Sequence, residues 1–184
     1  MTGFRARNAS DVSAERCLIL GYGNPARGDD GLGPAIISAL EKAGPFPGVT
    51  LDSDYQLTVE DSWNIARHDV TVFVDADVST EESFYFRRLE SEPEISFSSH
   101  SVRAEVLLGM AESLFGRSVK GYLLGVRGYN FEMFTETLSL DAHANLEKAT
   151  AFLRNLIETR EFESAAQTSR KNPNTQQHAC EGKT

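Results

Sequence analysis

Short apolar runs alternate along the chain with segments in which apolar residues recur every three or four positions. The continuous runs are typical of buried strands, and the spaced pattern is typical of helices that bury one face. The runs predict strands at residues 17–20, 49–54, 70–75, 84–89 and 121–126. The spaced pattern predicts helices at residues 35–43, 59–67, 101–115 and 140–162, the first of them beginning close to Gly31.

The order of these elements predicts the class of fold. Residues 70–75, VTVFVD, are apolar and β-branched on both faces, which suits the centre of a covered parallel sheet. Strands that alternate with helices predict a three-layer α/β fold, with a mostly parallel, twisted sheet of about five strands and helices on both faces. We expect a polar N-terminal arm at residues 1–15, a single α/β domain at 16–162 and a disordered polar tail at 163–184.

Composition limits the partners that this protein is expected to bind and the cellular compartment in which it is expected. The 184 residues carry 27 acidic and 18 basic side chains, a net charge of -9, so nucleic acid and anionic membrane surfaces are poor partners. Cys17 lies in an apolar run and Cys180 in the polar tail, a pattern that favours a reducing compartment. No apolar run approaches the roughly 20 residues that span a bilayer, and the N-terminus lacks the apolar core of a secretory signal. We therefore expect a cytoplasmic protein.

A glycine-rich segment, GYGNPARGDDGLG at residues 21–33, connects the first strand to the first helix. Loops of this kind often bind phosphate, but this one lacks the third glycine of G-x-G-x-x-G and the lysine of a P-loop. Asp29 and Asp30 would repel a phosphate by roughly 4 kcal/mol per contact at about 4 Å and an effective dielectric near 20. The two carboxylates either cap the following helix or form part of a site at the carboxyl edge of the sheet.

Two further residues point to that edge. Asp75 ends the strand VTVFVD, so its carboxylate should face the same crevice as Asp30, where ligands of open α/β sheets bind. Two carboxylates brought together need a cation or a shared proton. His100, in SFSSHS, precedes a predicted helix and is either a surface residue or a third ligand. Two carboxylates and an imidazole suit a divalent metal such as nickel or zinc.

These residues carry a resemblance to a known family. With Gly21-Tyr22-Gly23-Asn24, Asp29-Asp30-Gly31 and Gly33, then Asp75 in VFVDADVS and His100 in SSHS, the sequence resembles the hydrogenase maturation endopeptidases from about residue 17 to 162. The resemblance implies an α/β fold and an endopeptidase that removes the C-terminal peptide of a nickel–iron hydrogenase large-subunit precursor after nickel insertion. The nickel would be supplied by the precursor, which is the expected partner.

The resemblance also assigns residues. By motif position the nickel-sensing ligands fall on Asp30, Asp75 and His100, whose catalytic role is not separable from metal recognition. Many relatives carry Glu at the position of Asp30, and Asp29 is a second candidate there. For substrate contacts we expect Gly21, Gly23, Asn24, Tyr55 and Gln56.

Two other functions fit the sequence. The same three ligands would serve a non-catalytic nickel-checking or chaperone module for the same precursor. A Rossmann-like nucleotide-binding protein is the other alternative, and the Asp29-Asp30 pair argues against it.

Overall fold

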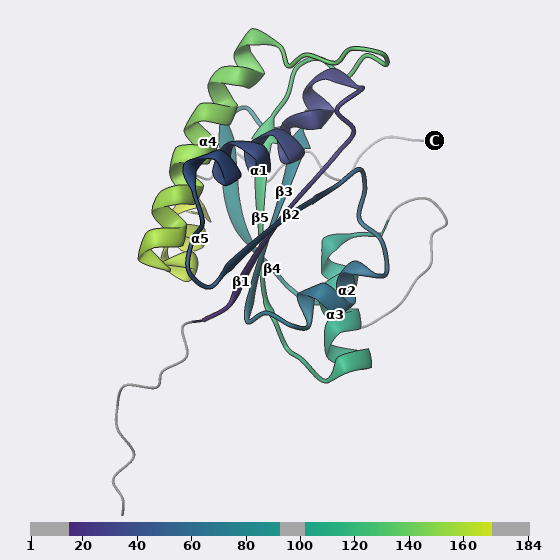
Figure 1. The fold of residues 1–184 in the computed structure, drawn as a ribbon, viewed down its shortest axis with the longest axis vertical. Helices are drawn as coiled ribbons and strands as arrows, with labels where there is room; N and C mark the ends of the chain where they lie inside the picture. Colours follow the sequence, from purple (N-terminus) through teal and green to yellow (C-terminus); the bar gives the residue numbers. More distant parts are fainter. Residues whose placement is uncertain (1–14, 93–101, 171–184) are drawn as a thin grey trace, which may run out of the picture.

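One mixed sheet organises the chain in the computed structural model, which describes residues 15–92 and 102–170 (Figure 1). Its strands are β1 (Cys17–Tyr22), β2 (Val49–Asp54), β3 (Val70–Asp77), β4 (Phe84–Leu89) and β5 (Lys120–Arg127). Their order across the sheet is β2-β1-β3-β5-β4. All neighbouring strands run parallel except β4, which pairs antiparallel with β5 at the edge. The predicted fold class is confirmed.

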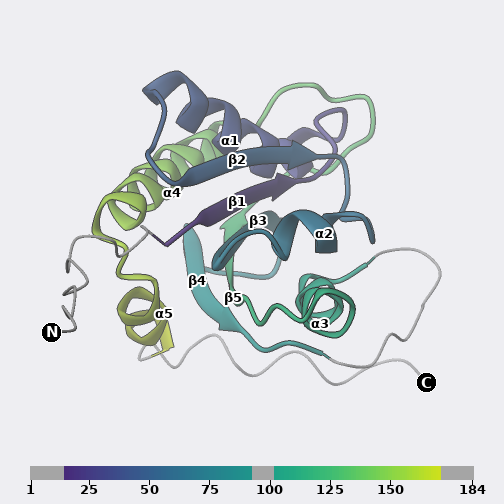
Figure 2. The same cartoon turned by 60° about the horizontal axis from the view of Figure 1, so that its bottom comes forward.

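Helices cover both faces of this sheet (Figure 2). They are the short 3-10 helix η1 (Gly28–Gly31), α1 (Leu32–Ala43), α2 (Asp61–Ile65), α3 (Ala104–Phe115), α4 (Leu140–Thr159) and α5 (Phe162–Arg170). One buried cluster joins α1, α4 and α5 to one face of the sheet, and another joins α2 and α3 to the opposite face. Among the residues described, no helix is long and apolar enough to cross a membrane.

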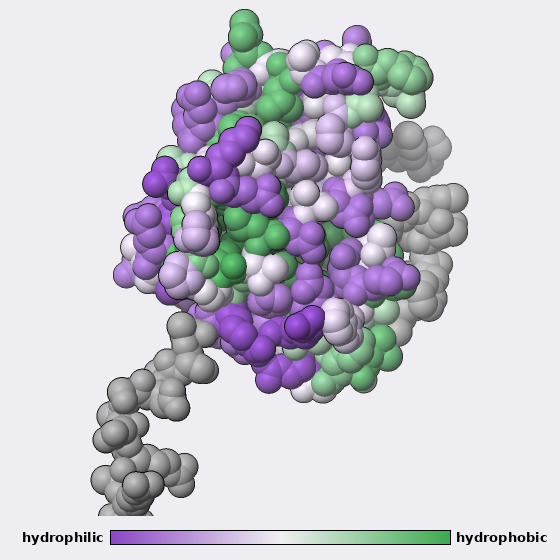
Figure 3. Space-filling view, in the orientation of Figure 1, coloured by the Kyte–Doolittle hydropathy of each residue, from purple (hydrophilic) through white to green (hydrophobic). Residues whose placement is uncertain are grey.

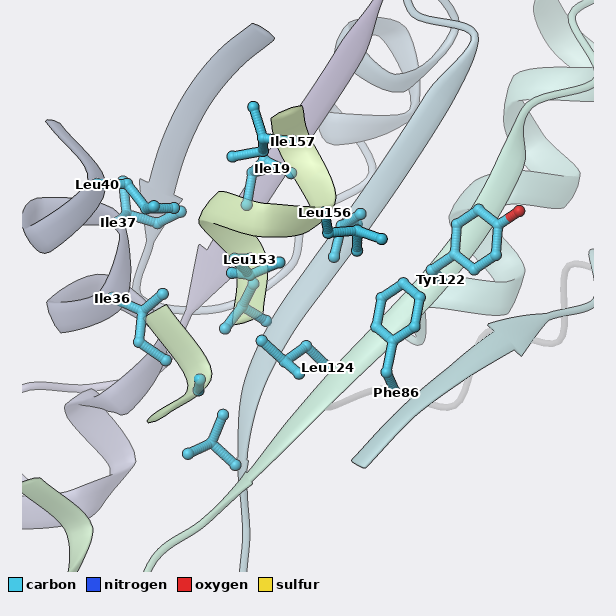
Figure 4. Packing of buried hydrophobic residues seen from close by; sticks show 14 of the residues in the cluster. Ile19, Ile36, Ile37, Leu40, Phe86, Tyr122, Leu124, Leu153, Leu156 and Ile157 are labelled. Carbon is cyan, nitrogen blue, oxygen red and sulfur yellow. The ribbon is translucent and has the colours of Figure 1, made fainter. Parts of the chain in front are cut away.

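The alternation of side chains along the strands explains why the core has two halves. In β1, Ile19 faces the α1 and α4 side, where Ile36 and Leu153 pack near it (Figure 4), while Leu18 faces the α2 and α3 side. Successive residues of a strand point to opposite faces, so a strand covered on both sides must be apolar throughout. Each fully buried Leu or Ile contributes about 1.5–3 kcal/mol relative to exposure.

Residues 163–170, which were predicted to belong to a disordered tail, form a helix instead. The left-handed backbone of Arg160 (φ 60°) ends α4, and residues 163–170 continue as α5 instead of extending the tail. Phe162 and Ala166, four residues apart, are buried, and Phe162 stacks on Tyr122 with ring centroids 5.7 Å apart. Glu163 accepts hydrogen bonds from Arg88 and from the Tyr122 hydroxyl. Residues 1–14, 93–101 and 171–184, which include His100, lie outside the described residues.

Candidate functional site

Close packing between β1 and α1 fixes where the glycine loop, residues 21–33, leaves the sheet. A Cβ on Gly21 would lie 2.5 Å from the carbonyl oxygen of Gly33, and a Cβ on Gly33 would lie 2.4 Å from that of Tyr22. Both glycines are buried, so this contact needs the absence of side chains. Gly21 was predicted to contact substrate, but its closest neighbours are the backbone and side chains of α1.

Gly23, just after β1, lets the chain fold so that the backbone of Asp30 packs against the end of this strand. Gly23 has φ 137°, and a Cβ there would lie 1.9 Å from the carbonyl oxygen of Asp30. The side chain of Asp30 is partly exposed: its Oδ2 accepts a hydrogen bond from the backbone N–H of Asn24 (3.1 Å) and lies 3.9 Å from the Arg27 guanidinium. Asp30 therefore keeps oxygen atoms at the edge of the sheet that are available to a ligand.

Asp29 has the opposite environment. It is 0% exposed, and its Oδ2 accepts hydrogen bonds from the backbone N–H groups of Tyr129 (2.7 Å) and Asn130 (2.9 Å). The backbone N–H of Ser139 donates to Oδ1 (2.7 Å) and the Ser139 hydroxyl donates to Oδ2 (2.8 Å). Burial raises the pKa of Asp29, but these hydrogen bonds outweigh it and hold the pKa below its ordinary value. Asp29 therefore fastens residues 128–139, the β5–α4 loop, to the glycine loop.

Neither aspartate caps a helix through its side chain. No side-chain cap hydrogen bond is formed at the start of η1 or of α1 within the described residues. The capping interpretation of the Asp29-Asp30 pair is therefore wrong, and the two side chains have different environments.

Asp75 lies two residues before the end of β3, and its pKa is the most strongly shifted among the acids of this edge. Burial, helped by the charges of Asp30 and Asp77, raises its pKa to about 6, although hydrogen bonds from Tyr22 and the Ala76 amide lower it. The charge of Asp30 thus contributes to the raised pKa of Asp75, which supports the predicted convergence of these two carboxylates. A perturbed acid at the carboxyl edge of a parallel sheet is a recognised mark of a functional site.

The remaining predicted substrate residues lie around this edge. Asn24 folds its side chain back onto its own loop, where Oδ1 accepts a hydrogen bond from the Ala26 amide (2.9 Å). Tyr55 and Gln56 are exposed just after β2. The Tyr55 backbone N–H donates to Asp54 Oδ1 (2.6 Å). Both side chains are free to meet a bound polypeptide.

The third predicted ligand cannot be placed. His100 lies outside the described residues, and α3 begins four residues later, at Ala104. Within residues 15–92 and 102–170, no group of three or more His, Cys, Asp or Glu side chains could hold a metal ion. The set of Asp30, Asp75 and His100 therefore stays a prediction.

Sequence analysis missed Tyr22, whose hydroxyl hydrogen-bonds Asp75; that hydrogen bond and the negative charge of Asp75 add to burial in raising the Tyr22 pKa. The alternation of side chains in β1 and β3 could have revealed this pair. Leu20 pairs with Phe73 in the register, and both lie on the α2 and α3 side, so Tyr22 and Asp75 two residues on share that face. The anchoring role of Asp29 had no comparable signal, because its partners lie about 100 residues away.

Comparison with solved structures identifies the fold. The chain is similar to the [NiFe] hydrogenase maturation protease HycI from Thermococcus kodakarensis KOD1, with a TM-score of 0.62 and 22% identity over 79% of this chain and 95% of that one. It is also similar to the hydrogenase maturating endopeptidase HybD from E. coli, with a TM-score of 0.60 and 24% identity over 78% and 93%. A hydrogenase 2 maturation peptidase from a Thaumarchaeota archaeon gives a TM-score of 0.59 and 21% identity over 78% and 99%.

No family model and no curated protein matches the sequence significantly. The likeness to solved structures, at these identities, shows the fold. The predicted resemblance to the hydrogenase maturation endopeptidases is confirmed at that level.

Proposed function

We propose that this protein is an endopeptidase that removes the C-terminal peptide of a nickel–iron hydrogenase large-subunit precursor after nickel has been inserted. The observation that carries the proposal is the pair formed by Asp30 and Asp75. Asp30 lies in η1 and Asp75 in β3, and the charge of Asp30 adds to burial, the main cause, in raising the pKa of Asp75 to about 6. Structural neighbours with the same fold are hydrogenase maturation proteases, which supports this reading of the edge.

In this proposal nickel is part of the substrate. Asp30, Asp75 and His100 bind the nickel that the precursor already carries, and this contact places the scissile bond beside the two carboxylates. The helix that follows His100, α3, packs on the face of the sheet shared by Tyr22 and Phe73.

The chemistry of the site suits hydrolysis of a peptide bond. A divalent ion beside the scissile carbonyl polarises it or activates a water molecule. A carboxylate with a pKa of about 6 also accepts a proton from water near neutral pH, and Tyr22 holds Asp75 in position for this role.

The test uses purified protein mixed with nickel-loaded and nickel-free precursor, with mass spectrometry of the released C-terminal peptide. We expect cleavage of the nickel-loaded form alone. Asp30→Asn, Asp75→Asn and His100→Ala should each lower cleavage at least about a hundredfold, the range of a lost acid–base or metal contact. Circular dichroism checks that each variant is folded.

Glu158→Gln is the matched control, because it neutralises an exposed carboxylate near the last turn of α4, away from the site. This variant should cleave like the wild type. Normal cleavage by Asp30→Asn and His100→Ala would refute the assignment of the site. Precursor that is bound but never shortened would show the non-catalytic alternative instead.

A further inference from the structure

The β5–α4 loop presents large apolar side chains to solvent beside the site. Exposed fractions are 47% for Tyr129, 65% for Met133 and 90% for Phe134, and 91% for Leu140 at the start of α4. Figure 3 shows hydrophobic surface at the upper right, over the tip of the loop that leads from β5 to α4 in Figure 1. Single exposed apolar residues are ordinary, but a group of them marks an interaction surface. Tyr129, Met133 and Phe134, the three that belong to the loop, are called the apolar loop surface below.

This surface is held firmly against the glycine loop. The Gly28 N–H donates to the Thr135 carbonyl (2.6 Å), the Thr135 N–H to the Ala26 carbonyl (3.2 Å), and the Asp29 N–H to the Asn130 carbonyl (2.7 Å). The four hydrogen bonds to the buried Asp29 carboxylate add to these. Since Asp30 is the next residue along the chain, the apolar loop surface has a fixed position relative to it.

The backbone of Phe134 is strained, and because its side chain is exposed, no burial energy offsets that strain. Its φ of 63° is in the left-handed region, which a bulky side chain rarely adopts, at a cost of about 1–3 kcal/mol. The bonds of the neighbouring Thr135 impose this conformation, and the ring it presents is almost entirely in water. Such strain persists where the surroundings enforce it, and it is concentrated at functional positions.

Charge around the loop indicates the chemistry of the partner. Glu132 and Glu136 are exposed in the loop itself, and Glu81 and Glu82 are exposed after β3, where the Arg127 guanidinium donates to the Glu81 carbonyl. Two arginines also lie against the loop: Arg27 pairs with Thr135 and lies 3.9 Å from Asp30, and Arg127 lies over the Tyr129 ring. A segment with basic and apolar side chains is complementary to this edge, whereas an acidic segment is repelled.

We propose that the apolar loop surface docks a basic, apolar segment of the precursor polypeptide adjacent to the scissile bond. This inference rests on the proposed function. Asp29 is a positioning residue in it, because it holds the docking surface at a constant distance from Asp30. Truncating an apolar residue of this surface weakens binding of the precursor, while the groups that carry out the cleavage are untouched.

The experiment compares Met133→Ala, Phe134→Asn and the double variant with the wild type on nickel-loaded precursor. Asn tolerates the left-handed backbone, so Phe134→Asn keeps the loop conformation. We expect KM and the directly measured Kd for precursor to rise about tenfold in the double variant, with kcat changed less than about twofold. Leu114→Ala is the control, because Leu114 is exposed near the end of α3. It should leave both constants unchanged.

Glu132→Gln combined with Glu136→Gln tests the charge argument, and it should reduce the loss of affinity that added salt causes in the wild type. Unchanged Kd and KM in the Met133 and Phe134 variants would overturn the docking proposal. So would sedimentation showing that wild type self-associates and that these variants do not, because the surface would then join two copies of this chain. If the wild type binds precursor but cleaves nothing, only the proposed function is refuted. The Kd values of the loop variants for precursor would still test docking.

Discussion

Asp29 and Asp30 are adjacent in sequence and chemically identical, yet their side chains differ in burial and in hydrogen bonding. Asp29 is 0% exposed and satisfied by four hydrogen bonds, whereas Asp30 accepts one backbone hydrogen bond and stays partly exposed. A buried carboxylate is tolerated only when such donors surround it. Asp29 therefore stabilises the architecture of the loops, and Asp30 remains available for a ligand.

The partly buried carboxylate of Asp75 opposes stability when it is charged. Its folded-state pKa of about 6 lies above the ordinary 3.8, so folding favours its protonated form. This contribution to stability is greatest below about pH 4, declines as the pH rises to about 6, and stays low above that value.

We therefore expect Asp75→Asn to stabilise the protein at pH 7.5 while abolishing cleavage. The neutral amide keeps an acceptor for Tyr22 and the Ala76 amide without a buried charge near Asp30. The melting temperature should rise by about 3 °C or more at pH 7.5, and by less at pH 5, where much of the wild-type Asp75 is protonated. Calorimetry at both pH values measures this, and a melting temperature that falls at pH 7.5 would contradict it.

At the scale of elements, the strands were easier to predict than the ends of the helices. Residues 49–54 and 84–89 match β2 and β4, and 70–75 falls inside β3. The pattern is clearest in β3, because its first five residues are buried. The helix predicted at 140–162 instead divides at Arg160 into α4 and α5. The signal for α5 was weak, since only Phe162 and Ala166 of the described side chains in it are fully buried apolar groups.

The α5 helix gives a direct test of this correction. Ala166→Glu places a carboxylate at a position that is 2% exposed, so it should lower the free energy of unfolding by about 2 kcal/mol or more. Ser164→Glu, at an exposed position of the same helix, should change it by less than about 0.5 kcal/mol. Urea unfolding measures both. Equal effects of the two substitutions would mean that residues 163–170 do not pack as a helix.

At the scale of the whole molecule, the sheet gathers residues that are remote in sequence. The glycine loop follows β1, Tyr55 follows β2, Asp75 lies at the end of β3, and the β5–α4 loop follows β5. Parallel strands direct their carboxyl ends to one edge, so one surface receives a contribution from each. In the function proposed above, the acids at this edge receive a cation that arrives with the precursor.

This arrangement predicts how the protein responds to metal removal. Dialysis against a chelator, followed by removal of the chelator, should leave cleavage of nickel-loaded precursor unchanged, because in the proposed function the nickel belongs to the substrate. Chelator treatment of the precursor before nickel insertion should abolish cleavage. Mass spectrometry of the C-terminal peptide measures both reactions. Activity that is lost on dialysis and restored by nickel alone would show that the metal resides in the protein.

The sequence by itself determined the succession of the strands and of most of the helices, and the mostly parallel character of the sheet. These follow from local hydrophobic periodicity and from the handed connection of parallel strands, which short stretches of chain encode. Only the tertiary structure decided which aspartate is buried, that Tyr22 contacts Asp75, and that the β5–α4 loop is fastened beside Asp30. Each of these depends on hydrogen bonds or burial between residues far apart along the chain, for which no local pattern exists.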